Sequence, residues 1–473
     1  MKPASLSPAR RAPLAPALRV AAVVLLAALG LAAGTVAGTD GMQKLALVGA
    51  ALLVYVALFI WQPEIALLTY IALRPLVDAF VRQGVGGYTL GVLWGFGLIV
   101  SAFLFFVIQA RDREEPLKFA AVPLAFLFLL AVLTLVRPGL GAAVAGWTRV
   151  ATWIIVLMVC ERISRDRRGQ QRCFNAAAAM VLTLLLAVGV MVAQGRFGAQ
   201  YYLSDVRHVS GQLPHPLAVG AVLLLPVALT AMLFVRPRWL ALVGGLALCA
   251  AIVVSYVRTA YIGAAVVLAA FVAAAIWGRG GARIAALVVI AVAAAMVWIV
   301  RASITYRLSD LTVLSSSGAA RGGAGNGRVE IWTTAVHKAF DTLPHALLGR
   351  GADAPAKVMM STLTLNVGAQ NDFLDFVLIG GLVLGVCYLV VLVWMTLSPL
   401  AVLRDPAQSS PAKAYATLVL GAMAAFVVMS MINGIATYQP VIAAGILVGL
   451  VRGMARTPGD TFLDEPPADG AEA

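Results

Sequence analysis

Long apolar runs alternate with short polar segments along almost the whole chain. Runs of about 20 apolar residues are typical of membrane-spanning helices, and we predict spans near residues 20–38, 45–61, 64–80, 89–109, 119–136, 142–160, 174–195, 214–235, 239–255, 259–277, 284–301, 372–396, 414–432 and 437–452. The runs are continuous, whereas the strands of a membrane β-barrel would alternate apolar and polar residues. The pattern predicts an all-α, polytopic integral membrane protein with about 12–14 transmembrane helices.

One polar interval, residues 302–371, is much longer than the others. Within it, the segment GRVEIWTTAVHKAF (327–340) predicts an amphipathic helix, because apolar residues recur at three- and four-residue spacing: Val329, Trp332, Val336 and Ala339. We expect this helix to end before the segment DTLPHALLGRG (341–351), in which Pro344 and the glycines form a turn. It would lie on the membrane surface or pack over the ends of the spans.

Composition supports the membrane assignment and adds an orientation. The 473 residues are 62% hydrophobic and 12% charged, with a mean hydropathy of +0.94. The net charge of +14 comes mostly from Lys and Arg in short segments between spans, as membrane topology requires, so we do not expect a nucleic acid partner. The densest cluster, ERISRDRRGQQR (161–172), and the other basic segments predict that both termini are cytoplasmic.

The chain therefore divides into five parts. We predict a cytoplasmic N-terminus, a first block of eleven spans, an external loop, a block of three spans and a disordered, acidic and proline-rich cytoplasmic tail, at residues 1–19, 20–301, 302–371, 372–452 and 453–473.

Ionisable residues within or beside the spans are candidates for function. Arg74 and Asp78 are four residues apart in the third predicted span, where they form either an internal ion pair or part of a ligand pathway. Arg207 and Arg258 precede external ends of spans, Arg258 in a very tight turn. They are either interfacial anchors or ligands for an anion.

The long polar interval and its return to the membrane carry further candidates. His337 lies on the amphipathic helix, either as a solvated side chain or as an acid–base group. Asp372 and Asp375 share a helix face at the start of the twelfth predicted span, and Asp372 could cap that helix.

Several enzyme classes lack their motifs here. The chain has no Walker motif, HExxH or GxSxG, and its four cysteines lack metal-ligand spacing, so we expect neither a metal nor a cofactor. External arginines beside an apolar interior suit an anionic, lipid-linked ligand such as a diphosphate, because Arg makes bidentate contacts to phosphate oxygens.

Four segments resemble the O-antigen ligase and O-antigen/exopolysaccharide polymerase superfamily of bacterial inner-membrane proteins. GRVEIWTTAVHKAFDTLPHALLGRG is similar to the family's Gly-Arg-x-x-x-Trp helix, which a Pro and a Leu-Gly-x-Gly turn follow. RHVSGQLPHPLA, SYVRTAYIG and QNDFLDFVLIGGLVLG are similar to three further family segments, in the same order and on the same predicted side of the membrane.

The resemblance implies metal-independent glycosyl transfer at the periplasmic face, so that the external loop is periplasmic. The implied donor is a glycan on undecaprenyl diphosphate, and the acceptor is lipid A core in a ligase or a second lipid-linked glycan in a polymerase. A chain-length regulator and a flippase of the same pathway are further implied partners. By position, the diphosphate would be bound by Arg207, Arg258 and Arg328, and the catalytic group would be Gln370, Asn371, Asp372 and His337.

One position departs from the family pattern. Gln370 stands where the family has a histidine proposed to activate the acceptor, and glutamine cannot act as a general base. Either His337, Asp372 or His208 takes the proton, or positioning alone suffices, or the protein is inactive. The departure favours a polymerase over a ligase. A lipid-glycan transporter or flippase without chemistry of its own, and a non-catalytic scaffold, are the alternatives.

Overall fold

The structure is a computed structural model that describes most of the chain between residues 42 and 464. The described residues are 42–79, 84–85, 88–110, 121–135, 140–193, 200–203, 206–209, 215–235, 238–255, 257–275, 291, 294, 328–363, 368–436, 441–459 and 461–464. Two predicted spans, near 20–38 and 284–301, lie outside these residues except for 291 and 294. Residues 302–327 and 364–367 of the long polar interval also lie outside them.

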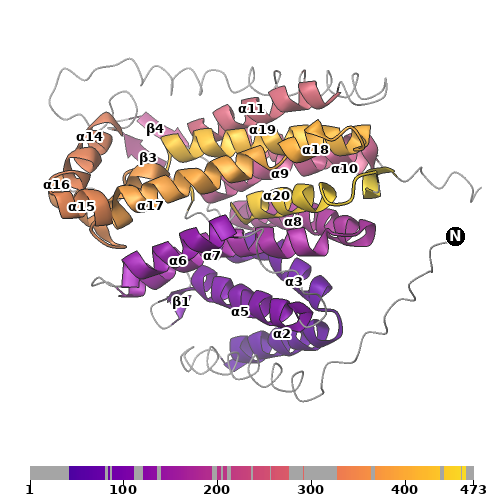
Figure 1. Ribbon diagram of the computed structural model, residues 1–473, viewed down its shortest axis with the longest axis horizontal. Helices are drawn as coiled ribbons and strands as arrows, with labels where there is room; N and C mark the ends of the chain where they lie inside the picture. Colours follow the sequence, from indigo (N-terminus) through magenta and orange to yellow (C-terminus); the bar gives the residue numbers. More distant parts are fainter. Residues whose placement is uncertain are drawn as a thin grey trace, which may run out of the picture.

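Helices make up almost all of the described structure, and the axes of most of them are roughly aligned (Figure 1). The N-terminal half contains α2 (Met42–Trp61), α3 (Pro63–Ala72), α4 (Arg74–Ala79), α5 (Leu90–Ala110), α6 (Ala121–Leu135), α7 (Leu140–Ile163) and α8 (Arg167–Ala193). The rest of the bundle consists of α9 (His215–Phe234), α10 (Arg238–Val254), α11 (Arg258–Ala274), α17 (Asp372–Leu397), α18 (Leu400–Arg404), α19 (Ser410–Ile432) and α20 (Ile442–Met454).

Three shorter helices gather at the end of the bundle where α17 begins (Figure 1): α14 (Arg328–Ala339), α15 (Leu343–Leu348) and α16 (Ala354–Leu363). Two small antiparallel hairpins complete the fold: β1 (Gly84–Val85) with β2 (Tyr88–Thr89), and β3 (Gln200–Leu203) with β4 (Val206–Val209). The hairpin of β3 and β4 lies toward the same end of the molecule as α14.

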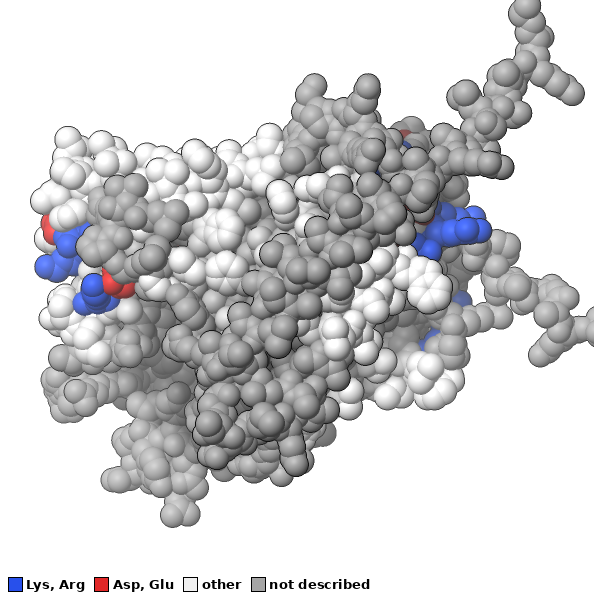
Figure 2. Space-filling model, turned by 90° about the horizontal axis from the view of Figure 1, so that it is seen from below, with Lys and Arg blue, Asp and Glu red and all other residues white. Residues whose placement is uncertain are grey.

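The prediction of an all-α, multi-pass membrane protein is confirmed. Six described helices, α5, α7, α8, α9, α17 and α19, are long and apolar enough to cross a membrane, and six shorter apolar helices accompany them. Charged side chains gather toward the two ends of the face drawn in Figure 2, and the described residues between them form an uncharged band. This distribution is what a bilayer requires of a spanning bundle.

The third predicted span is broken into α3 and α4 at Leu73. Pro75 is the cause, because its ring would clash with the carbonyl group four residues earlier in a continuous helix. The hydroxyl of Thr183 in α8 donates to the carbonyl oxygen of Ala72 at 2.5 Å. Arg74 is buried and donates from Nη1 to the carbonyl oxygen of Gly91 at 3.0 Å. The side chain of Asp78 lies outside the described residues, so the predicted ion pair stays a prediction.

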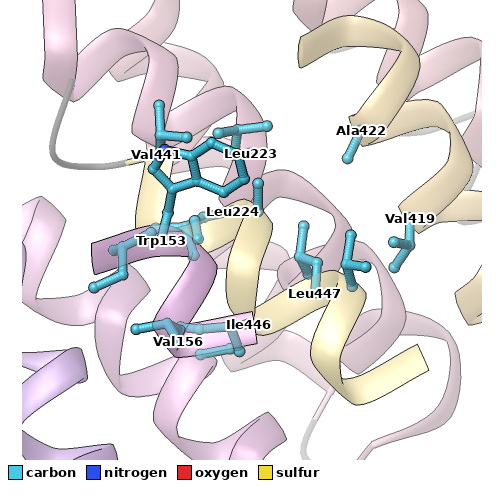
Figure 3. Close-up of a cluster of buried hydrophobic side chains, with 14 of the residues drawn as sticks. Trp153, Val156, Leu223, Leu224, Val419, Ala422, Val441, Ile446 and Leu447 are labelled. Carbon is cyan, nitrogen blue, oxygen red and sulfur yellow. The ribbon is translucent and has the colours of Figure 1, made fainter. Parts of the chain in front are cut away.

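The centre of the bundle is the seam between α7 and α20, which α9 and α19 also contact. Figure 3 shows side chains from these four helices in contact, among them Trp153, Val156, Leu223, Leu224, Val419, Ala422, Ile446 and Leu447. Glycines at four-residue spacing line α20: a Cβ would lie 2.3 Å from the Trp153 oxygen at Gly445 and 2.6 Å from the Leu157 oxygen at Gly449. Small residues at this spacing let two membrane helices approach closely.

The described structure continues beyond the predicted start of the disordered tail at residue 453. Helix α20 extends to Met454, and a 3-10 helix covers Phe462–Asp464. Phe462 is buried with its ring centroid 5.0 Å from that of Phe174 in α8. Two adjacent apolar residues in an otherwise acidic segment are enough to anchor it, which the average composition of the tail concealed.

Candidate functional site

The start of α17 is tied to the end of α19 by the side chain of Asn371. Its Oδ1 accepts a hydrogen bond from the Leu374 amide at 3.1 Å, so Asn371 is the N-cap of α17. Its Nδ2 donates to the carbonyl oxygen of Met431 at 2.8 Å. The cap is therefore Asn371, whereas the sequence suggested Asp372. The shift has a physical cause: Asp372 is already helical and turned toward α19.

Asp372 is almost completely enclosed, with a relative exposure of 2%. Both carboxylate oxygens accept from the backbone amide of Ala436 at 2.9 Å, and the hydroxyl of Tyr388 donates to Oδ2 at 3.2 Å. The Tyr388 oxygen also lies 2.8 Å from Oγ of Ser430. Asp372 therefore holds the turn after α19 against α17. This saturated environment makes it a structural residue rather than a free base.

Asp375, one turn further along α17, has a more open environment. It is half-buried, and its Oδ1 accepts from the Ala369 amide at 2.7 Å. Glycines lie on two sides of the carboxylate. A Cβ at Gly368 would lie 2.9 Å from Oδ1, and a Cβ at Gly434 would lie 2.9 Å from Oδ2. The backbone therefore approaches this carboxylate more closely than a residue with a Cβ would allow, and the side chain of Asp375 is half-buried between the two glycines.

Gln370 is the one described non-glycine residue with a positive φ, 52°. Such left-handed conformations are unfavourable for most side chains by about 1–2 kcal/mol and are found at functional sites and tight turns. The Cα of Gln370 lies 3.8 Å from the position of a Cβ on Gly434. Gly434 is therefore close to Gln370 and to Asp375. The same Cβ position would lie 3.7 Å from Oδ1 of Asp372.

A kink in α17 fixes the position of its first two turns. Gly380 and Gly381 have non-helical backbone angles, with φ +71° at Gly381. The kink frees two carbonyl groups, and the turn that follows α15 supplies their donors. The amide of Arg350 donates to Leu378 at 2.7 Å, and that of Gly351 donates to Ile379 at 3.0 Å. The Leu-Gly-x-Gly turn and the Gly-Gly pair, two separate sequence motifs, are thus direct partners.

Helix α14 packs against α16 and α17. The face it buries is Ile331, Ala335 and Ala339. The predicted stripe was wrong at Val336, which is 44% exposed. The alanines explain the rotation, because small side chains allow a close approach to α17 that the larger valine would prevent.

The connection between α14 and α15 is polar. Oδ1 of Asp341 lies 2.8 Å from Nδ1 of His345, and Oδ2 of Asp341 pairs with the guanidinium of Arg350. The hydrogen bond with His345 and the charge of Arg350 lower the pKa of Asp341. Nε of Arg350 also donates to the carbonyl oxygen of Lys338 at 2.9 Å. These contacts hold the Leu-Gly-x-Gly turn in place.

The structure brings together only part of the predicted site. Gln370, Asn371 and Asp372 meet at the junction of α17 and α19, but His337 is exposed on α14, outside this enclosed cluster. The side chains of Arg207, Arg258 and Arg328 lie outside the described residues. Their backbones are placed: Arg207 pairs with Tyr202 in the β3–β4 hairpin, Arg258 begins α11 and Arg328 begins α14.

The register of α11 against α19 places Arg258 at the same end as the carboxylates. A Cβ on Gly263 would contact Met429, and one on Gly421 would contact Ala270, so the two helices are antiparallel. The start of α11 therefore lies near the Asn433–Ala436 turn, to which Asp372 is bonded.

Sequence reasoning placed Asp375 beside Asp372 but assigned it no role, and it missed Tyr388, Ser430 and the turn at Gly434. The three-residue spacing of the two aspartates was a signal for Asp375, but nothing local indicated partners some 60 positions away. Within the described ranges, no group of three or more His, Cys, Asp or Glu could hold a metal ion. The arrangement offers one half-buried carboxylate, that of Asp375, with the strained residue Gln370 and several backbone donors nearby. No family model and no curated protein matches the chain.

Proposed function

We propose that the protein catalyses membrane-embedded glycosyl transfer from an undecaprenyl-diphosphate-linked glycan, extending O-antigen or exopolysaccharide units at the periplasmic face of the bacterial inner membrane. The proposal combines the resemblance of four sequence segments with a multi-pass bundle that holds a half-buried carboxylate, Asp375, at one end. Buried ionisable residues in a membrane protein are expensive to retain and usually serve function.

The observation that carries this proposal is the environment of Asp375. This carboxylate is half-buried, is approached by backbone at Gly368 and Gly434, and lies at the end of the bundle where α11 begins with Arg258. A carboxylate and an arginine at one end of an apolar bundle are the two kinds of group that transfer from a lipid diphosphate needs. Asp375 thereby takes the role for which Gln370 is chemically unsuited.

The proposed reaction follows from these roles. An acceptor hydroxyl forms a bond to C1 of the donor sugar while the bond between C1 and the diphosphate oxygen breaks. The diphosphate leaves with the electron pair, and its growing charge is stabilised by Arg258 and Arg207. The hydroxyl proton passes to the carboxylate of Asp375. Gln370 and Asn371 orient the acceptor, and no metal takes part in these roles.

The acceptor distinguishes the two forms of the proposal. A second lipid-linked glycan makes the protein a polymerase, which we favour, and lipid A core makes it a ligase. A transporter would use intramembrane ionisable residues such as Arg74 and Asp78, together with the broken third span. Arg74 and the break have a packing explanation, because Arg74 bonds to Gly91 and Thr183 satisfies the carbonyl group at the break.

The proposed orientation places both termini in the cytoplasm. Its support is the distribution of basic residues. Arg452 and Arg456 both pair with Glu161 at the end of α7, and α20 contacts α8, which begins at Arg167. The C-terminal arginines and the basic cluster around Arg167 therefore lie at the same end of the bundle. Arg452 pairs with Glu161 at 2.8 Å and covers the ring of Trp394 at 4.3 Å, near the end of α17 opposite Asp372.

Deletion and complementation in the source cell test this function. Lipopolysaccharide and secreted polysaccharide from the deletion strain are compared on gels with those from strains that carry wild-type protein or Arg258→Ala. Loss of long polymer in both the deletion and Arg258→Ala strains, with the variant still in the membrane, supports the polymerase. Loss of glycan-capped lipid A indicates the ligase. Unchanged glycans in the deletion strain would overturn the proposal.

A further inference from the structure

Helix α15 exposes apolar side chains at the end of the bundle. Leu343 is 73% exposed, Leu347 is 45% exposed and Leu348 is 48% exposed. Three large exposed leucines within six residues are unfavourable in contact with water, because the apolar surface they present there could otherwise be buried. Such patches mark contact with a partner or a membrane.

The lipid-facing side of α17 shows which partner fits. Its exposed apolar residues recur at alternating three- and four-residue spacing along one face: Val383, Val386, Val390, Val393 and Leu397. From Val383 to Leu397 this stripe is about 21 Å long, at a rise of about 1.5 Å per residue. The hydrocarbon core of a bilayer is about 30 Å thick. The stripe of α17 therefore falls short of the core by about 9 Å.

Helix α15 is fixed at the point where the stripe stops. A Cβ on Gly381 would lie 2.1 Å from the carbonyl oxygen of Leu347, so the two backbones touch just before Val383. The exposed leucines of α15 therefore continue the apolar surface of α17 beyond its kink.

Backbone polar groups around this contact are paired within the protein, as contact with lipid requires. A bilayer does not tolerate unpaired backbone groups. The carbonyl groups of Leu378 and Ile379, freed by the kink, accept from Arg350 and Gly351. At the other end of α15, Thr342 caps the helix through a bond from the His345 amide. The carbonyl groups freed by the kink and the His345 amide in the first turn of α15 therefore have partners within the protein.

We infer that α15 is embedded in one leaflet of the bilayer, where Leu343, Leu347 and Leu348 contact lipid acyl chains and complete the apolar belt of α17. The partner is the bilayer itself. One consequence is that Asp372 and Asp375, which precede the kink, lie at the level of the headgroups rather than within the hydrocarbon core. The inference does not rest on the proposed transferase activity.

Nitroxide labelling in liposomes tests the inference. Labels are attached to Leu343→Cys and Leu347→Cys in the full-length protein, in a background in which the half-buried Cys387 is replaced by alanine. Accessibility to oxygen, which concentrates in lipid, is compared with accessibility to a water-soluble nickel chelate. Val386→Cys is the lipid control, and Lys357→Cys, whose side chain is 73% exposed, is the water control.

We expect both α15 labels to show the oxygen preference of Val386→Cys, with an oxygen-to-nickel ratio several-fold above that of Lys357→Cys. A label at either α15 position that behaves like Lys357→Cys would overturn the inference. The measurement needs no glycan substrate, so its result is independent of whether the protein is a transferase.

Discussion

Two glycine-rich contacts within one bundle have opposite characters. On α20, Gly445 and Gly449 bring the helix onto the backbone of α7 at Trp153 and Leu157. On α17, Gly381 brings the backbone onto that of α15 at Leu347. The first contact keeps both helices regular, and the second breaks one of them, with φ +71° at Gly381.

The two contacts differ in how the backbone hydrogen bonds beside them are made. The α7–α20 seam is apolar packing between complete helices, so its backbone groups are satisfied within each helix. The α15–α17 contact exchanges hydrogen bonds between two chain segments and fixes the turns that carry Asp372 and Asp375. The seam thus serves as framework, whereas the kinked end holds polar groups in fixed positions. Function is therefore expected at the kinked end, and changes there should affect activity as well as stability.

The largest effect is expected for Asp375→Asn. Asparagine can still accept from the Ala369 amide but cannot take a proton, so glycan transfer should fall by about 10²–10⁴-fold, the usual contribution of general base catalysis. The measurement is the rate of glycan transfer per molecule of folded protein. Asp353→Asn is the matched control, because the described ion pair of Asp353 is with Lys357 on α16 and its loss should leave the rate unchanged. Equal rates in the two variants would refute the role of Asp375.

Gly381→Ala should destabilise the protein strongly. The new Cβ meets the carbonyl oxygen of Leu347 at a backbone angle that disfavours alanine, and strain together with overpacking should cost about 3 kcal/mol. The midpoint of thermal unfolding in detergent reports the change. Gly146→Ala is the control, because no atom lies within 4 Å of the new Cβ. The free energy of unfolding of this variant should stay the same or rise by up to about 1 kcal/mol, since alanine favours a helix more than glycine does. A Gly381→Ala protein as stable as wild type would show that α15 can move away from α17 without loss of stability.

Gly449→Ala separates the framework from the site. Its Cβ would lie 2.6 Å from the carbonyl oxygen of Leu157, and overpacking of the seam should cost about 1–3 kcal/mol. Because the seam carries no reacting group, transfer per folded molecule should stay at the wild-type rate. Thermal unfolding and transfer assays on the same preparation measure both quantities. A rate that falls as far as it does in Asp375→Asn would mean that the two regions are not separable.

The smallest effect concerns pH. Because His345 and Arg350 lower the pKa of Asp341 in the folded protein, this carboxylate contributes stability above the pKa of the unfolded chain, about 4. That contribution is lost as the pH falls through the lowered folded pKa. Asp341→Asn should therefore unfold at a lower temperature than wild type at pH 7, and the two curves should converge in acid. A difference in unfolding temperature between Asp341→Asn and wild type that persists at low pH would show that the charge of Asp341 does not cause the loss of stability.

The class of fold could be predicted from the sequence, but only part of the site could. Apolar runs located the helices because a bilayer imposes their length, and Pro75 marked the break between α3 and α4. The buried face of α14 was mistaken at Val336, because two apolar stripes overlap on that helix and only the contact with α16 and α17 selects one. The partnership of Gly351 with Ile379, and of Asp372 with Ala436, depends on long-range packing that no local pattern encodes.

Turnover by the purified protein in liposomes is the most direct test of the account. The liposomes contain undecaprenyl-diphosphate-linked glycan, and glycan length and free undecaprenyl diphosphate are measured together. The account predicts that wild-type protein lengthens the glycan and releases one undecaprenyl diphosphate for each bond formed, and that Arg258→Ala and Asp375→Asn do neither. A donor that stays intact with wild-type protein, or turnover that persists in both variants, would contradict it.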